Sequence, residues 1–332
     1  MHTENKILLS IVIPFYNVEK HIEDCLLSVY NQDLPEEMYE VICVNDASPD
    51  NSRSIVVEFQ KNHTNLILVD HSYNKKLGAA RNTGRSIAKG KYIWNVDSDD
   101  YIKPNVLKKL TETCLSNDLD ILMINFYHNF NGVERINSKY PFKESNVQSG
   151  ISFIKNYCLN SFGEISPVWS QLYKKDFLFL NKISSPESNY AEDAPFTFKS
   201  LFLANKVKSV VTAGYVYKLN QNSIGSEIEL MPTALKLYEK CFVSTIELKK
   251  ISIYIPENEL QIRQKFYNVY KYTISIFPQY ISKMSDLEFI LFCSLCRKYF
   301  LSNLNLIFLM SRKTLIKYLF CIIIPVLKRH NN

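Results

Sequence analysis

Glycine is scarce in this sequence, with 8 residues in 332, although it usually makes up about 7% of a protein. A secretory signal is also missing, because the amino terminus carries the acidic Glu4 and no basic segment followed by a long apolar one. The protein is therefore predicted to stay inside the cell. The 8 cysteines are scattered, mostly in apolar runs, as is typical of reduced core thiols. The CxxC at Cys293 and Cys296 has no second pair and no nearby histidine, which favours helix packing over a metal or redox role.

Acidic residues are absent after Glu288, although basic residues continue to the end of the chain. Seven basic residues follow that position: Arg297, Lys298, Arg312, Lys313, Lys317, Lys328 and Arg329. The longest nearby stretch without charged or amide side chains, 318–327, has ten residues, whereas about 20 are needed to span a bilayer. The tail is therefore predicted to lie on an anionic membrane surface as basic amphipathic helices. Packing on its own domain or on a second subunit is the alternative.

The overall charge is only mildly basic, at +6. Apolar runs separate the basic residues of the tail, so they do not form the polar stripe that nucleic acids require, and lipid binding is favoured. A hydrophobic fraction of 46% is ordinary for a folded protein.

The first hundred residues alternate short β-branched runs with amphipathic segments, which is typical of βαβ units and a parallel sheet. The predicted strands are 8–13, 39–44, 66–69 and 92–96, and the predicted helices are 18–30, 51–61 and 78–88. Asp50 or Ser48 is expected to cap the second helix. A helix at 106–116, a strand at 120–126 and a polar loop at 129–145 follow.

The pattern changes after Gly225. Four later segments have helical length and periodicity with little strand character: 231–250, 257–277, 287–300 and 306–327. We therefore predict a first domain at 1–225, with halves at 1–103 and 104–225, and a helical, membrane-associating module at 226–332.

Acidic side chains directly follow two predicted strands. Asp46 comes after the strand at 39–44, and Asp97 and Asp99 come after the strand at 92–96. Ligands of open α/β sheets bind where the carboxyl ends of the strands meet. Carboxylates two residues apart can share a hard divalent cation, and Mg²⁺ typically adds phosphate and water to one or two of them. A solvated turn is the alternative, but the position at a strand end favours a cation site.

Three of the scarce glycines, Gly78, Gly84 and Gly90, fall within thirteen positions just before this acidic cluster. Such a concentration predicts backbone that approaches a ligand or packs closely on the sheet. For Gly90, a turn or a helix end is the favoured interpretation.

Four ordered motifs resemble those of the family-2 glycosyltransferases with the GT-A fold. They are SIVIPFYNVEKHIEDCLLSVYNQ, EVICVNDASPDNS, LGAARNTGRSIAKGKYIWNVDSDDYI and NYAEDAPFTFKSLFLAN, within residues 9–218. In order, they resemble the first strand and helix, the second strand with a base-reading aspartate, the Arg-Asn helix with the DxD metal motif, and the ED motif. The resemblance implies an α/β GT-A fold, a Rossmann-like and mostly parallel sheet flanked by helices. Residues 1–103 would bind the nucleotide sugar and 104–225 would face the acceptor.

The resemblance also implies an inverting, hexosyltransferase-type enzyme that uses Mn²⁺ or Mg²⁺ and a nucleotide sugar, with UDP favoured by family frequency. The implied donor-binding residues are Pro14, Tyr16, Asn17, Asp46, Gly78, Arg81 and Asp97. The implied metal ligands are Asp97 and Asp99, with Asp99 preferred as the direct one. Asp193 is the implied general base, with helix capping as its alternative role. Glu192, Trp169 and Tyr217 are implied on the acceptor side, although an aromatic at helical spacing is more often core.

The sequence departs from the processive branch of the family, because it lacks the QxxRW motif and multiple membrane spans. We therefore expect transfer of one sugar per binding event, by a peripheral enzyme at the cytoplasmic membrane face that acts on a glycan or lipid-linked acceptor. The rival interpretations are an inactive nucleotide-sugar-binding protein and a nucleic-acid binder. His21, His63, His71 and His128 show no ligand spacing, so surface positions or local hydrogen bonds are predicted for them.

Overall fold

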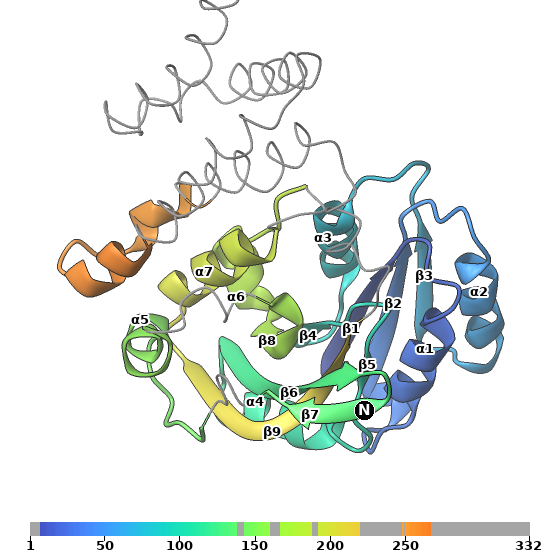
Figure 1. The fold of residues 1–332 in the computed structure, drawn as a ribbon, viewed down its shortest axis with the longest axis horizontal. Coiled ribbons are helices and arrows are strands. Elements are labelled where there is room, and N and C mark those ends of the chain that lie inside the picture. The colour runs from blue at the N-terminus through green and yellow to red at the C-terminus, as the bar shows by residue number, and fades with distance from the viewer. Residues whose placement is uncertain are drawn as a thin grey trace, which may run out of the picture.

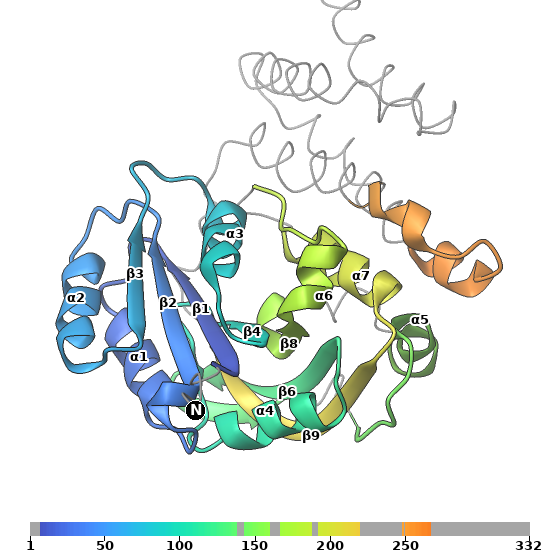
Figure 2. The same cartoon turned by 180° about the vertical axis from the view of Figure 1, so that it is seen from behind.

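The computed structural model of the chain describes residues 7–137, 143–159, 167–187, 192–219, 248 and 250–266. Their strands form a nine-stranded sheet in the order β3-β2-β1-β4-β8-β6-β9-β5, and β7 pairs with β6 outside this path. Helices cover both faces of the sheet, as Figures 1 and 2 show from opposite sides. The predicted α/β architecture is confirmed.

The amino-terminal half of the sheet is parallel. It contains β1 (Leu9–Phe15), β2 (Tyr39–Asn45), β3 (Leu66–Asp70) and β4 (Tyr92–Asn95). Every residue of β1, β2 and β4 is buried. Strands covered on both faces read as near-continuous apolar runs, which is why these strands were visible in the sequence.

The other half of the sheet is mixed. The long strands β6 (Ile121–Phe130) and β9 (Val207–Lys218) are parallel, and β8 (Gln171–Lys174) joins the halves by antiparallel pairing with both β6 and β4. The two-residue β5 (Tyr101–Ile102) pairs with β9.

The polar loop predicted at 129–145 is partly wrong, because β7 (Val133–Ile136) returns along β6. Asn131 and Gly132 connect the two strands and both have positive φ, 50° and 86°. Asn-Gly with positive φ at both residues is the favoured two-residue hairpin turn.

The helices pack as two layers on the sheet. One hydrophobic cluster includes α1 (Ile22–Tyr30), α2 (Ser52–Asn62) and α4 (Leu107–Ser116), and the other includes α3 (Leu77–Ile87), α6 (Lys175–Leu180) and α7 (Asp193–Leu203). The short α5 (Gly150–Phe153) continues as a π-helical turn, Ile154–Cys158, beside α7. The four predicted helices up to residue 116 are confirmed. Of the two predicted caps for α2, the Asp50 carboxylate accepts the Ser52 N–H at 3.1 Å, while the Ser48 hydroxyl donates to Asp50.

Two of the three clustered glycines pack tightly against β1. A Cβ on Gly84 would collide with the Val12 side chain, and a Cβ on Gly90 would lie 2.5 Å from the Ser10 nitrogen. Gly90 is therefore more than a turn residue: its backbone lies directly on β1, where Ser10 cannot move without breaking the sheet.

We expect Gly90→Ala to lower the free energy of unfolding by about 1–3 kcal/mol, because the added methyl overpacks a rigid site. Denaturant titration measures the change. Ser86→Ala, on the exposed side of the neighbouring helix, is the matched control and should stay within about 0.5 kcal/mol of wild type. A Gly90→Ala protein as stable as this control would contradict the prediction.

The described part of the predicted C-terminal module packs on the sheet domain. Phe266 lies edge-on to Phe198 and Phe202 of α7, with ring centroids 5.5 Å apart in each pair. Lys155 forms an ion pair with Glu259 at 3.0 Å. Residues 267–332, with the CxxC and the basic tail, lie outside the described residues, so the predictions for them stay predictions. No helix within the described part is long and apolar enough to cross a membrane.

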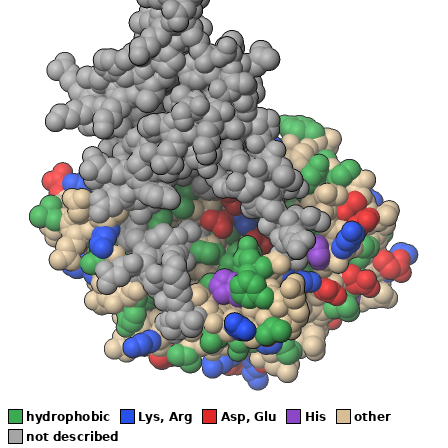
Figure 3. Space-filling model, in the orientation of Figure 1, with side chains coloured by type: hydrophobic (Ala, Val, Ile, Leu, Met, Phe, Trp, Pro, Cys, Tyr) green, Lys and Arg blue, Asp and Glu red, His purple; other side chains and the backbone are tan. Residues whose placement is uncertain are grey.

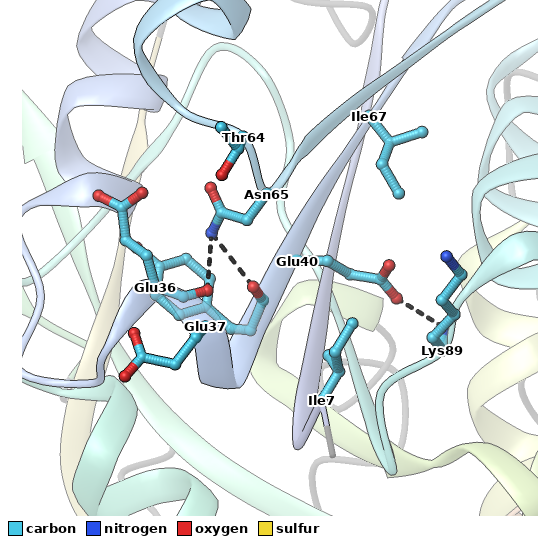
Figure 4. A pocket seen from close by; sticks show the side chains of 9 residues that line it. Ile7, Glu36, Glu37, Glu40, Thr64, Asn65, Ile67 and Lys89 are labelled. Atoms are coloured by element: carbon cyan, nitrogen blue, oxygen red, sulfur yellow. Dashed lines mark hydrogen bonds between the residues drawn. The ribbon is translucent and has the colours of Figure 1, made fainter. Parts of the chain in front are cut away.

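A cavity of about 390 Å³ lies at the amino ends of β1, β2 and β3, and Figure 4 shows its lining. The buried Glu40 carboxylate there accepts hydrogen bonds from the Ser10 hydroxyl at 2.6 Å and the Lys89 N–H at 2.5 Å. These contacts tie β2 to β1 and to the segment after α3. The cavity is thus at the edge of the sheet opposite to the one where the predicted site residues lie.

Candidate active site

The predicted donor-binding residues gather where β1, β2 and β4 end. The parallel register places Phe15 beside Asn45, so the loops that follow β1 and β2 start side by side. Acidic side chains are visible near the middle of the face drawn in Figure 3. Ligands of open α/β sheets bind at this carboxyl edge of the strands.

The loop after β1 presents an exposed aromatic ring. Pro14 is buried at the end of β1, whereas Tyr16 is 46% exposed. Asn17 has a φ of 56°, and its N–H donates to the Ser48 hydroxyl at 2.6 Å. The loop is thereby fixed to the loop after β2, and the Tyr16 ring stays exposed next to the end of β1.

The Asp46 carboxylate is buried and surrounded by donors. It accepts hydrogen bonds from His71 Nδ1 at 2.7 Å and from the N–H groups of Lys75 and Lys76 at 2.8 and 2.9 Å. Lys76 is held at a φ of 80°, which L-residues rarely adopt. The loop between β3 and α3 therefore wraps around this carboxylate, and Gly78 is buried in the first turn of the helix that follows.

The Arg81 guanidinium lies at the centre of three carboxylates. Its Nη2 contacts Asp97 at 2.6 Å, and its Nη1 contacts Glu192 at 2.8 Å and Asp193 at 2.6 Å. Arg81 is 1% exposed, while Asp97 and Asp193 are 22% and 24% exposed. The cluster joins α3 and the end of β4 to the start of α7, and Arg81 and Asp193 lie 112 positions apart in the chain.

Asp193 is the first residue of α7, with Glu192 before it. Burial, followed by the charge of Asp193, raises the pKa of Glu192. Burial also raises the pKa of Asp193, and the Arg81 charge opposes this rise. Asp193 accepts hydrogen bonds from Arg81 and from the Val168 N–H. These contacts lie outside α7, so they do not support the helix-cap alternative.

The carboxylates of the acidic motif after β4 differ in burial and in their contacts. Asp100 is buried, and its carboxylate accepts hydrogen bonds from the Tyr215 hydroxyl at 2.6 Å and the Lys218 N–H at 2.7 Å. Burial, followed by the charges of Asp99 and Asp97, raises the pKa of Asp100 well above its usual range. Asp100 therefore fixes the motif to β9, while Asp97 and Asp99 stay partly exposed.

The residues present fit a divalent cation with few protein ligands. Asp97 and Asp99 offer the oxygen donors that Mg²⁺ and Mn²⁺ prefer. Their negative charges also contribute to the raised pKa of Asp100. Within the described residues, no group of three or more His, Cys, Asp or Glu side chains is placed to hold a metal by itself. The remaining ligands would have to come from phosphate and water.

A stack of aromatic rings packs beside this acidic motif, since its Tyr215 contacts both Asp100 and the Asp97 N–H. The Trp169 ring stacks on Tyr215 and Tyr217, with centroids 4.3 and 5.6 Å away, and Phe126 meets it edge-on at 4.7 Å. Trp169 is only 6% exposed, so it packs as part of the core. Tyr217 is less buried and is the ring of this stack better placed to meet a ligand.

Comparison with known proteins identifies the family. Residues 10–174 match the family described as Glycosyl transferase family 2. Glycosyltransferase EpsJ of Bacillus subtilis is 33% identical over 244 residues, which cover 72% of this chain and 69% of EpsJ. The chain belongs to glycosyl transferase family 2.

The chain is also similar to a longer curated protein and to a solved structure. A poly(ribitol-phosphate) β-glucosyltransferase of Bacillus spizizenii is 34% identical over 226 residues, but the chain spans only 34% of that longer protein. The crystal structure of S. aureus TarS 1–349 in complex with UDP-GlcNAc has a TM-score of 0.68 at 24% identity, covering 87% of this chain and 79% of that one. The chain is thus a family-2 glycosyltransferase with the GT-A fold.

The structure brings most of the predicted site residues of this glycosyltransferase to one edge of the sheet. Arg81 contacts three carboxylates, a grouping that motif spacing did not predict. His71 was predicted to lie at the surface or to make local hydrogen bonds, but it is buried and contacts Asp46 and Thr83, which lie 25 and 12 positions away. Tyr215 and Asp100 had no predicted role in the site. No local pattern in the sequence indicated the contact between Tyr215 and Asp100, which lie 115 positions apart.

Proposed function

We propose that this glycosyltransferase transfers one sugar from a nucleotide sugar, with UDP favoured, to an acceptor hydroxyl by single displacement with inversion. One observation carries the proposal: Asp97, from the donor side, and Asp193, from the ED motif, both contact the Arg81 guanidinium at 2.6 Å. A carboxylate suited to proton removal is thereby held close to the acidic motif that would bind the donor.

The residues of the chain divide the work as follows. Tyr16 and Asp46 bind the base, and Asp97 binds the ribose. Asp99 and Asp97 would hold a Mn²⁺ or Mg²⁺ ion, which acts as a Lewis acid and stabilises the departing diphosphate. Asp193 accepts the proton of the acceptor hydroxyl. Burial raises its pKa above the usual range, which makes it a stronger proton acceptor than an exposed carboxylate.

The proposed acceptor is a glycan or a lipid-linked glycan of the cell surface. The name of the Bacillus spizizenii relative, a poly(ribitol-phosphate) β-glucosyltransferase, supports a surface polymer as acceptor class. We further propose that the two sheet halves serve donor and acceptor, and that the basic tail within 226–332 associates with the cytoplasmic membrane face. Cosedimentation with anionic vesicles at low and high salt measures this attraction, which salt should weaken.

We expect UDP-sugars with Mn²⁺ to stabilise the protein, by about 2.7 kcal/mol when the ligand is present at 100 times its dissociation constant. Asp99→Asn should lose the part of this stabilisation that depends on Mn²⁺. Thermal unfolding with a panel of nucleotide sugars, with and without Mn²⁺, measures both effects.

Asp176→Asn, in the exposed first turn of α6, is the matched control and should behave as wild type. A donor-stabilised protein without hydrolysis or transfer on any acceptor would indicate the inactive sugar-nucleotide-binding protein instead. An Asp99→Asn variant with an unchanged Mn²⁺ response would remove Asp99 from the proposed metal site.

A further inference from the structure

The Asp46 carboxylate has nearly all of its hydrogen-bonding capacity occupied. An ionised carboxylate only accepts hydrogen bonds, at about four lone-pair positions. His71 Nδ1 and the Lys75 N–H occupy Oδ1, and the Lys76 N–H occupies one position of Oδ2. One position on Oδ2 remains. The side chain is therefore prepared to accept one further N–H donor.

His71 is held at both ring nitrogens. It is 8% exposed, its Nδ1 faces Asp46 at 2.7 Å, and its Nε2 faces the Thr83 hydroxyl on α3 at 2.9 Å. Its backbone N–H also donates to the Asn45 carbonyl at 2.9 Å. Because ionised Asp46 can only accept, Nδ1 must carry the proton, and the Thr83 hydroxyl can then donate to Nε2.

We propose that His71 is a positioning residue that sets the nucleobase selectivity of the donor site. By donating to Oδ1 it fixes the rotation of the Asp46 carboxylate, so that the remaining acceptor position on Oδ2 meets the base edge in a single orientation. The inference rests on the proposed role of Asp46 as the base contact.

The remaining acceptor position on Oδ2 of Asp46 determines which nucleobases can pair with it. Uracil presents a ring N–H at position 3, which can donate to Oδ2. Cytosine presents a lone pair at the same position, so two acceptors would face each other and a buried carboxylate would lose a partner. A site with a buried polar group strongly rejects a ligand that cannot form a hydrogen bond with that group. An apolar pocket discriminates between similar ligands far less. A fixed carboxylate should therefore bind UDP in preference to CDP.

Two isosteric substitutions separate the contacts of His71. In His71→Asn the amide N–H lies near the place of Nδ1 and can still donate to Asp46, but the Thr83 contact is lost. In His71→Gln the amide lies near the place of Nε2, so the Thr83 contact is kept and the Asp46 contact is lost. Both variants keep a polar side chain at the same buried site, which makes each the control for the other.

The dissociation constants of UDP and CDP, measured by calorimetry in Mn²⁺, test the proposal. We expect His71→Gln to reduce the UDP over CDP preference about tenfold, the effect of one hydrogen bond. The preference of His71→Asn should stay within about twofold of wild type. At saturating donor, kcat should be little changed in both variants. A contact that binds the ground state and the transition state equally raises only KM when it is lost.

Other outcomes decide against the proposal. If His71→Gln keeps the wild-type preference, or if Asn and Gln lose it equally, His71 is a structural brace and the inference is wrong. Asp46→Ala distinguishes this from failure of the underlying assignment. If Asp46→Ala removes the UDP preference while His71→Gln does not, only the role of His71 fails. If Asp46→Ala keeps it, Asp46 does not contact the base.

Discussion

Asp193→Asn is expected to reduce kcat by about 10²–10⁴-fold, the usual contribution of a general base, while donor affinity and folding stay close to wild type. The amide cannot take a proton from the acceptor hydroxyl. It can still accept a hydrogen bond from Arg81, and Asp97 and Glu192 remain as carboxylate partners of that guanidinium. Transfer assays at saturating donor, together with UDP binding and thermal unfolding, separate these effects.

Glu192→Gln is the matched control, because Glu192 precedes Asp193 and contacts the same Nη1 of Arg81. It is more buried, with 7% of its side chain exposed against 24% for Asp193, so it is less able to reach an acceptor. Its loss of kcat should be clearly smaller. If instead Glu192→Gln is inactive and Asp193→Asn is active, the base is Glu192.

Arg81→Met is expected to cost about 3–5 kcal/mol of folding stability and nearly all transfer activity. Removing one partner from a buried ion pair leaves uncompensated charge, and here three carboxylates would lose the guanidinium that separates them. Arg81→Lys keeps the charge, but a single ammonium cannot reproduce the fork that contacts Asp97 on one side and Asp193 on the other. It should be more stable than Arg81→Met and still poorly active. Urea unfolding measures the stabilities.

The stability loss of Arg81→Met should depend on pH. The Arg81 charge lowers the pKa of both Glu192 and Asp193, so its removal raises the pKa of these groups in the folded state. A carboxyl whose pKa is raised by folding loses stability as pH rises through that folded value. The difference from wild type should therefore be smaller near pH 5 than near pH 8. A loss that is equal at both pH values would show that these carboxylates do not carry it.

Most strands and helices of the parallel half could be predicted, because each is specified by the pattern of its own neighbouring residues. Strands buried on both faces are apolar throughout, and amphipathic helices show their own period, so β1 to β4 and the helices between them were found within a few residues. Local patterns failed where pairing decided the structure. The segment Val133–Ile136 is polar and exposed, and it is a strand because the Asn131-Gly132 turn returns it to β6.

The site divides in a similar way. Motif spacing and family resemblance placed Asp46, Asp97, Asp99 and Asp193 at element ends, as the structure has them. They did not show that Arg81 would be buried among three carboxylates or that His71 would hold Asp46 from the end of β3. Trp169 was implied on the acceptor side with core packing as the alternative, and its ring is buried and stacked on Tyr215.

Fold class, family and the residue types that the chemistry needs can be predicted from short-range patterns and ordered motifs. Which charged side chains meet depends on how distant segments pack. Arg81 and Asp193 lie 112 positions apart in the chain, and their contact depends on how α3 and α7 pack on one face of the sheet. The electrostatic balance of the site is a property of that packing, since charges act through distance in space and through burial.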